Sequence, residues 1–164
     1  MKGDPQVIDY LNRALTSELT AINQYWLHYR VLHHWGVRKL AEYERHESID
    51  EMKHADVLAE RVLFLDGLPN FQAINRLKVG ETVEEILRAD LALEMEAIPL
   101  LRDAIQHCES SRDYVSREIF ERILESEEEH VDFLETQFEM MERMGLPNYV
   151  QLHSEAAGDG GTGA

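Results

Sequence analysis

Apolar residues recur at intervals of three and four along nearly the whole chain, and the alternation typical of β-strands is nearly absent. This spacing predicts four long amphipathic helices over about residues 5–36, 38–66, 82–110 and 113–145. A short fifth helix is predicted over about residues 148–153. The predicted fold class is therefore all-α, with long helices that bury their apolar stripes against one another.

Local signals mark the ends of these helices. Asp4 can cap the first helix, and Pro5 suits its first turn. Thr82 and Glu85 have the spacing of a capping box at the start of the third helix. Gly67 follows the second helix, where a residue without a side chain is favoured at a helix end.

The connections between the helices differ in length. The first and the third are short, so the helices they join should be antiparallel neighbours. The second takes about fifteen residues, which in extended form reach roughly 50 Å. Because a helix of about 28 residues is roughly 42 Å long, this segment can cross the whole bundle. We therefore expect a four-helix bundle with one long crossover between the second and third helices.

Acidic residues and histidines interrupt the apolar stripes in a repeated pattern. A lone glutamate is followed by Glu-x-x-His in the next helix, and the same set returns at the same spacing in the second half of the chain. Residues three apart share a helix face, so each Glu-x-x-His can direct a carboxylate and an imidazole at one point. Sets of this kind are known from di-iron and di-manganese bundles. The six candidate ligands are Glu18, Glu51, His54, Glu94, Glu127 and His130.

The chemistry of these six side chains favours a pair of metal ions. They fall at similar depths in their helices and should meet near the middle of the bundle. Four buried carboxylates would repel one another unless cations neutralised them. Carboxylate with imidazole suits iron or manganese, and the lack of thiolate disfavours structural zinc. Glu51 and Glu127 are the natural bridging ligands. The other four ligands form two pairs, and each pair would complete the coordination of one metal ion. These pairs are Glu18 with His54 and Glu94 with His130.

Composition narrows the class of protein. A formal net charge of −16 argues against nucleic acid and anionic membranes as partners; it is compatible with attracting cations or simply with solubility. The only cysteine is Cys108, so no internal disulfide can form. No membrane-spanning run or signal peptide is visible, and we expect a cytoplasmic protein. We expect one domain over residues 1–155 and a disordered tail over residues 156–164.

With these residues in view, the chain resembles the bacterioferritin family over about residues 1–155. The ligand pattern is joined by local matches at residues 1–4, 21–25, 46–56, 64–70 and 113–117. The resemblance implies a ferritin-like bundle and a hollow shell of twenty-four subunits built from two-fold dimers. It also implies a di-iron ferroxidase centre in each bundle, a ferric mineral inside the shell, and haem b at the two-fold interface.

Further residues take a role from this resemblance. It implies that Met52 ligates the haem iron together with the same residue of a second subunit; the alternative is a methionine that fills an interface gap. Tyr25 would hydrogen-bond near the metals or donate an electron, or else be a core tyrosine. His46 and Asp50 would form an iron site on the inner surface, unless they belong to a solvated face. Glu47 would support the ligands from behind.

The expected function is iron storage by a ferroxidase. Fe(II) would be oxidised with dioxygen or hydrogen peroxide, and haem with a ferredoxin-type reductant would aid iron release. The main alternative is a di-iron oxygenase or peroxidase that acts on another substrate. The resemblance also aligns four residues with a polar channel for iron: His34, Asp66, Asp132 and Thr136. Of these, His34 and Asp66 depart from the residue types common in the family.

Overall fold

The computed structural model describes residues 1–156, so the predicted tail lies outside the described residues from position 157 on. Within residues 1–156 the chain forms helices and no strand. The helices are α1 (Pro5–His34), α2 (Arg38–Phe64), α3 (Val83–Ser111), α4 (Tyr114–Met144) and α5 (Leu146–His153). The predicted fold class is therefore confirmed.

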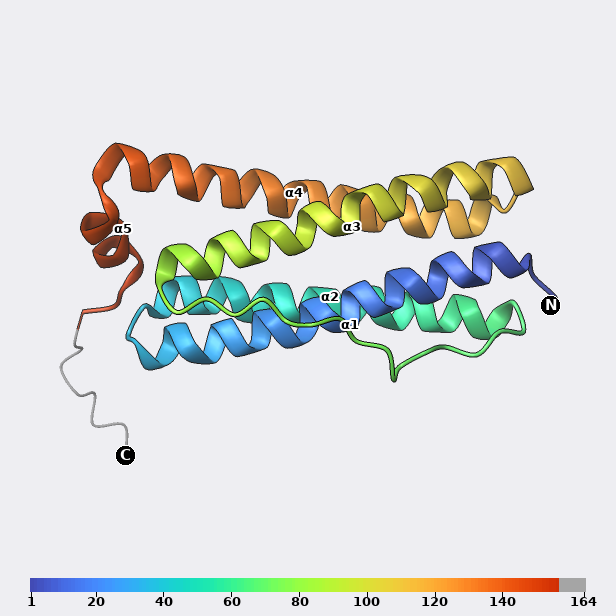
Figure 1. The fold of residues 1–164 in the computed structure, drawn as a ribbon, viewed down its shortest axis with the longest axis horizontal. Helices are drawn as coiled ribbons and strands as arrows, with labels where there is room; N and C mark the ends of the chain where they lie inside the picture. The colour runs from blue at the N-terminus through green and yellow to red at the C-terminus, as the bar shows by residue number, and fades with distance from the viewer. Residues whose placement is uncertain (157–164) are drawn as a thin grey trace, which may run out of the picture.

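The four long helices form two antiparallel hairpins, α1–α2 and α3–α4, that lie against each other (Figure 1). α1 packs on α2, α3 packs on α4, and α1 also contacts α3. The segment after α2 runs along the bundle to its far end, where α3 begins (Figure 1). α5 lies at that same end, against α4 and α2. The long crossover predicted from the length of this connection is confirmed.

The helix ends follow the predicted signals with small corrections. Asp4 accepts hydrogen bonds from the N–H groups of Gln6 and Val7, at 2.7 and 3.1 Å. Thr82 accepts from the N–H of Glu85 at 3.2 Å, and the carboxylate of Glu85 accepts from the residue before the cap, Glu81, at 2.8 Å. This second bond lies one position earlier than a capping box predicts.

Two helix limits differ from the prediction for backbone reasons. α2 ends at Phe64 rather than near residue 66, because Asp66 takes a left-handed conformation with φ of 60°. α5 begins at Leu146, earlier than predicted. Gly145 turns the chain with φ of 81°, and Pro147 is accommodated in the first turn, where no backbone donor is required.

Polar side chains of α1 anchor the crossover. Three of them accept hydrogen bonds from its backbone N–H groups, in the pairs Thr20 with Asn75, Gln24 with Lys78 and His28 with Gly80, at 2.9, 3.0 and 3.2 Å. The acceptors are spaced four residues apart, so they lie on one face of α1. At Gly80 the backbone of the following helix leaves no room for a Cβ. The crossover is therefore held along the bundle rather than looped into solvent.

A layer of polar side chains divides the apolar core into two parts. One part, near the start of α1, includes Leu11, Leu58, Leu101, Phe120 and Ile123. The other part, near the end of α1, includes Leu32, Leu40, Ile86, Leu134 and Tyr149. Full burial of one such side chain stabilises the fold by roughly 2 kcal/mol. These two apolar parts allow the bundle to bury polar groups between them.

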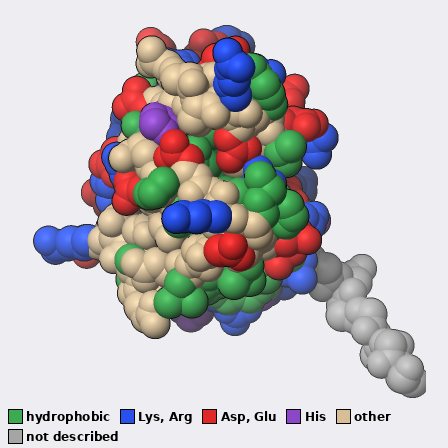
Figure 2. All heavy atoms as spheres, turned by 90° about the vertical axis from the view of Figure 1, so that its right-hand side faces the viewer, with side chains coloured by type: hydrophobic (Ala, Val, Ile, Leu, Met, Phe, Trp, Pro, Cys, Tyr) green, Lys and Arg blue, Asp and Glu red, His purple; other side chains and the backbone are tan. Residues whose placement is uncertain are grey.

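The surface is charged and mixed where Figure 2 shows it. At the end of the bundle where α1 begins, acidic, basic and apolar side chains are interspersed, so this face carries no patch of a single sign (Figure 2). None of the described helices combines the length and apolarity needed to cross a bilayer.

A partly buried ion pair between Arg61 and Asp113 joins the two hairpins. Asp113 caps α4 by accepting from the N–H of Ser116 at 3.0 Å, and Arg61 of α2 donates to the same carboxylate oxygen at 2.8 Å. Burial opposes the charge, but the hydrogen bonds from Ser116 and the guanidinium of Arg61 lower the pKa of Asp113 below its ordinary value.

We predict that Asp113→Ala lowers the free energy of unfolding at pH 7 by about 1–2 kcal/mol, as expected for loss of a helix cap. Asp113→Asn keeps an acceptor and should cost less. A lowered carboxyl pKa stabilises the fold above the unfolded value and loses this effect as pH falls through the folded value. The difference between the unmodified protein and Asp113→Asn should therefore shrink in acid. Urea unfolding followed by circular dichroism measures it; a constant difference would contradict the role of the charge.

Candidate metal centre

The six predicted ligands converge at the middle of the bundle. α1 supplies Glu18, α2 supplies Glu51 and His54, α3 supplies Glu94, and α4 supplies Glu127 and His130. They form two overlapping groups, each with one possible ligand atom per residue and all such atoms within 4.8 Å of one another. The first group is Glu18, Glu51, His54 and Glu127, and the second is Glu51, Glu94, Glu127 and His130. The two glutamates assigned above as bridging ligands are the members that the groups share.

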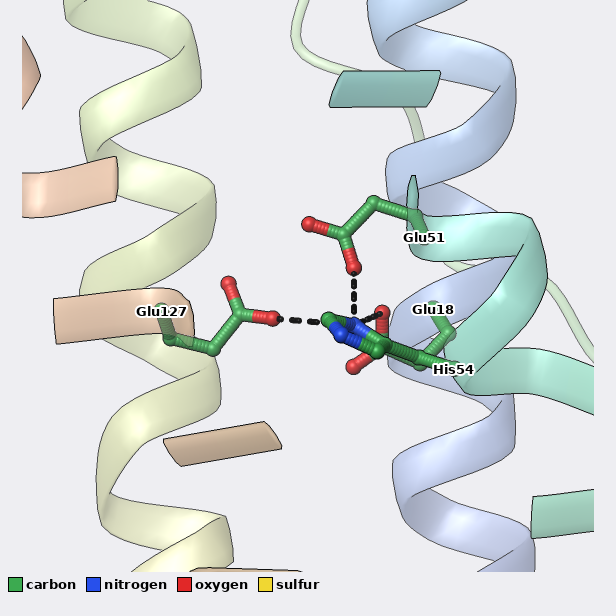
Figure 3. A group of neighbouring side chains, drawn as sticks. All are labelled: Glu18, Glu51, His54 and Glu127. Carbon is green, nitrogen blue, oxygen red and sulfur yellow. Dashed lines mark hydrogen bonds and ion pairs between the residues drawn. The ribbon is translucent and has the colours of Figure 1, made fainter. Parts of the chain in front are cut away.

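Figure 3 shows the first group around the ring of His54. Its Nδ1 lies 2.9 Å from Oε2 of Glu51, 3.5 Å from Oε2 of Glu18 and 3.8 Å from Oε1 of Glu127. The three carboxylates come from three different helices and all face the imidazole. The helix spacing brings them together because Glu51 and His54 are three residues apart, on one face of α2.

The second group is built in the same way around His130. Its Nδ1 lies 3.3 Å from Oε1 of Glu51 and 3.5 Å from both Oε1 of Glu94 and Oε2 of Glu127. Glu51 and Glu127 therefore turn one oxygen toward each imidazole. Two bridging carboxylates, with one further carboxylate and one imidazole on each side, make a donor set suited to two iron or manganese ions.

The buried atoms of the centre are those that metal ions would satisfy. Within residues 1–156, the buried side-chain atoms without a hydrogen-bond partner include Oε2 of Glu18, Oε1 of Glu51, Oε1 of Glu127 and Nδ1 of His130. Buried polar atoms are normally paired, because an unpaired one costs about 1–3 kcal/mol. Four such atoms from facing residues fit a cationic ligand between them.

Two further side chains hold ligands from behind. Nε2 of His130 contacts a carboxylate oxygen of Glu47, which leaves Nδ1 directed at the centre. The hydroxyl of Tyr25 donates to Oε1 of Glu94. Outer groups of this kind set the orientation and basicity of metal ligands. Both contacts lie on the half of the centre that contains His130.

Burial and neighbouring charges shift the pKa values of three side chains at the centre. Burial, together with the charge of Glu51, raises the pKa of Glu18 well above its ordinary value. Burial raises the pKa of Glu94 to about 7, although a hydrogen bond with His130 opposes the shift. Burial disfavours the charged form of His130, but hydrogen bonds with its carboxylate neighbours outweigh this and raise its pKa. Each of these three shifts favours the protonated form of its side chain.

A second buried polar network lies beside the centre and was not assigned a role from the sequence. Oδ1 of Asp90 is 2.9 Å from both Nδ1 of His28 and Nε2 of Gln24. Nε2 of His28 accepts from the crossover at Gly80, so the imidazole proton is on Nδ1 and points to Asp90.

Glu44 completes this network. Both its oxygens are buried without a hydrogen-bond partner among the described residues, and burial with the neighbouring charge of Asp90 raises its pKa well above the ordinary value. With its imidazole nitrogens engaged, His28 serves to anchor the crossover. The sequence could have indicated this network, because Glu44 and Asp90 both lie on the stripes of their helices that face the core.

Comparison with known proteins agrees with this architecture. The family model of the ferritin-like domain matches residues 8–144. The chain is 47% identical to a bacterioferritin of Brucella melitensis over 157 residues, which cover 96% of this chain and 98% of that protein. It is 50% identical to a bacterioferritin of Streptomyces coelicolor, covering 92% and 90% of the two chains. A bacterioferritin of Rhodobacter capsulatus is 49% identical, with coverage of 94% and 96%.

The chain belongs to the bacterioferritin family. Several residues predicted from that resemblance lie at the surface, whereas Tyr25 and Glu47 are buried beside the centre. Met52 is 56% exposed, and it lines a groove of about 610 Å³ together with Trp26, Leu27 and Leu77. An apolar groove with an exposed thioether fits a flat apolar cofactor. Haem binding by this bacterioferritin chain remains a prediction, since the second methionine would come from another copy.

The predicted inner-surface site is not assembled by contacts within one chain. His46 is exposed, and Asp50 pairs with Lys53 at 2.9 Å. Neither belongs to the groups of possible ligands found within residues 1–156. The predicted channel residues are all exposed; they are His34, Asp66, Asp132 and Thr136. Of these, His34 and Asp66 lie near opposite ends of the α1–α2 hairpin. The inner-surface site and the channel both remain predictions.

We predict that Glu18→Gln stabilises the metal-free protein, because it removes a carboxyl group whose ionisation is costly in this position. A gain of about 1 kcal/mol corresponds to roughly 2–4 °C in melting temperature. The same change should reduce the further rise in melting temperature on adding Co²⁺. Glu42→Gln, on the exposed face of α2, is the matched control and should leave both values unchanged. Equal Co²⁺ stabilisation of Glu18→Gln and the unmodified protein would exclude Glu18 as a ligand.

Proposed function

We propose that this chain is a cytoplasmic iron-storage ferroxidase that oxidises Fe(II) at the mid-bundle centre and stores the ferric product in a shell of its own copies. One observation carries the proposal: Glu51 and Glu127 each present one oxygen to His54 and one to His130. This arrangement suits two cations held side by side. The names of the relatives, all bacterioferritins, support iron as the cation.

The ligands contribute charge and proton exchange. Two Fe(II) ions, the substrate, lose one electron each, and the oxidant gains both. With two protons, dioxygen becomes hydrogen peroxide, or hydrogen peroxide becomes two waters. Four carboxylates stabilise Fe(III) more than Fe(II), because the attraction grows with the charge of the ion. The pKa values of Glu18 and His130 are raised in the metal-free centre, so binding of Fe(II) would compete with protons at both side chains.

Tyr25 and Glu47 fit supporting roles in this reaction. The phenol of Tyr25 donates to the ligand Glu94 and is fully buried, and its pKa is raised by burial and by the nearby carboxylates. It therefore stays protonated and can keep Glu94 in place. Because it contacts a ligand directly, it is also placed to donate an electron. Glu47 fixes the ring of His130 through the opposite nitrogen.

The groove at Met52 fits haem shared between two copies. Its apolar walls would hold the macrocycle, and one thioether from each copy would bind the haem iron. Bound haem would supply electron transfer into the mineral when a ferredoxin-type protein reduces it, and so aid iron release. His46 and Asp50, if they bind iron, would act only on the inner surface of the assembled shell.

The competing function is oxidation of an organic substrate by the same centre. It would require an open substrate pocket beside the metals and a smaller assembly. Particle mass separates the two functions, because about 24 copies of a 19.0 kDa chain give a particle of order 450 kDa. A dimer or tetramer in size-exclusion chromatography would contradict the storage shell.

We predict that Glu127→Ala or His130→Ala reduces the initial rate of Fe(II) oxidation by about 100-fold or more, since each removes a direct ligand. Stopped-flow absorbance after mixing Fe(II) with aerated protein measures the rate. The exposed neighbour Glu128→Ala is the matched control and should retain the rate. Size-exclusion chromatography should show the same particle for all variants. Rapid oxidation by Glu127→Ala would contradict the ligand assignment.

We predict that Met52→Leu abolishes haem binding without slowing Fe(II) oxidation, because leucine keeps the apolar volume but has no sulfur ligand. Visible absorption of protein reconstituted with haem measures occupancy. Met95→Leu removes another exposed methionine, 54% exposed on α3, and should bind haem like the unmodified protein. Undiminished haem absorbance with Met52→Leu would exclude this residue as the axial ligand.

A further inference from the structure

His54 is the most exposed of the six ligands. Its side chain is 20% exposed, whereas that of His130 is 8% exposed and that of Glu51 is fully buried. The outer side of the His54 ring lines a groove of about 420 Å³ between α2 and α4. One side of the ring therefore faces three carboxylates (Figure 3), and another faces solvent-accessible space.

The walls of this groove lead to the metal centre along α4. Val115, Ile119 and Ile123 line it at four-residue steps, and the next step along the same face is the ligand Glu127. From α2, Val57 lines the groove one turn beyond His54. A continuous apolar stripe thus connects the outside of the bundle with the ligands.

The chemistry of the groove suits a small neutral molecule. Its remaining lining residues are Glu118 and Arg122, and these two neutralise each other in an ion pair at 2.6 Å. No net charge is therefore supplied to draw a hydrated cation inward. The apolar walls also offer hydrogen peroxide no replacement for the hydrogen bonds that it makes in water. Dioxygen loses little on leaving water and enters apolar space readily.

We propose that the groove between α2 and α4 is the passage by which dioxygen reaches the metal centre, with the ring of His54 at its inner end. This inference rests on the proposed function and deepens it, since it assigns dioxygen rather than hydrogen peroxide as the oxidant that the groove admits. Fe(II) then reaches the ligands by another route. His54 serves both as a ligand and as the boundary between the passage and the centre.

Val57→Trp tests the passage, because an indole at this 42% exposed position fills the groove without entering the core. We expect the KM for dioxygen in Fe(II) oxidation to rise several-fold, with the rate at saturating dioxygen retained. Anaerobic titration with Co²⁺ should give unchanged affinity and stoichiometry. The matched control is Leu63→Trp, on the same helix and outside the groove, where leucine is 59% exposed. It should match the unmodified protein in both measurements.

Xenon provides a readout that is independent of activity. Crystals of the unmodified protein under xenon pressure should show the gas beside Val57 and Ile119, since xenon binds apolar cavities. Crystals of Val57→Trp should not. Unfolding temperatures equal to that of the unmodified protein would show that the variants are intact.

Several outcomes would overturn the passage. An unchanged KM for dioxygen with Val57→Trp would do so, as would slower binding of Co²⁺ by this variant, which would make the groove a cation route. If Val57→Trp slowed Fe(II) oxidation by hydrogen peroxide as much as oxidation by dioxygen, the groove would not be selective for dioxygen. Absence of Co²⁺ binding to the unmodified protein would instead refute the proposed function, and this result is distinguishable because the xenon measurement needs no metal.

Discussion

The fold is organised around the mutual repulsion of four carboxylates buried at the middle of a helical bundle. Glu18, Glu51, Glu94 and Glu127 come from four different helices and face one another in a space without solvent. Such a set is unstable as four anions. Burial with the charge of Glu51 raises the pKa of Glu18, and hydrogen bonds with carboxylates raise the pKa of His130 against the effect of burial. Hydrogen bonds from its neighbours outweigh burial at Glu51 and lower its pKa. Both raised values reduce the negative charge that the four carboxylates would otherwise carry together.

Apolar packing elsewhere in the bundle holds the four buried carboxylates in position. Apolar side chains above and below it hold the helices in register, so that side chains from each helix meet at one level. The crossover adds a constraint on α1 and α3. His28 bonds both to the crossover and to Asp90, which lies one turn from the ligand Glu94 on α3. A segment outside the bundle is thereby tied to the interior next to the metal centre.

Much of this architecture follows from periodicity and spacing. The four helices, the crossover and the convergence of six ligands were predictable because helix geometry relates residues three, four and seven apart, whatever their distant neighbours. The limits of α5 and the displaced capping bond of Glu85 were not, since they depend on backbone turns at single residues. Glu44 and Asp90 approach each other from different helices, and no local pattern encodes such a proximity. The role of Met52 depends on a second copy of the chain, and the roles of His46 and Asp50 remain predictions.

The two halves of the centre are alike in sequence and unlike in surroundings. Each contains one imidazole whose Nδ1 faces three carboxylates, yet His130 is fixed from behind by Glu47 and its neighbour Glu94 by Tyr25. His54 has no such support among the described residues and borders an apolar groove instead. A repeat in the chain thus specifies the six candidate ligands, and the residues behind them make the two halves different. The half with His130 is supported by two outer side chains, whereas the half with His54 borders the groove that we propose as the passage for dioxygen.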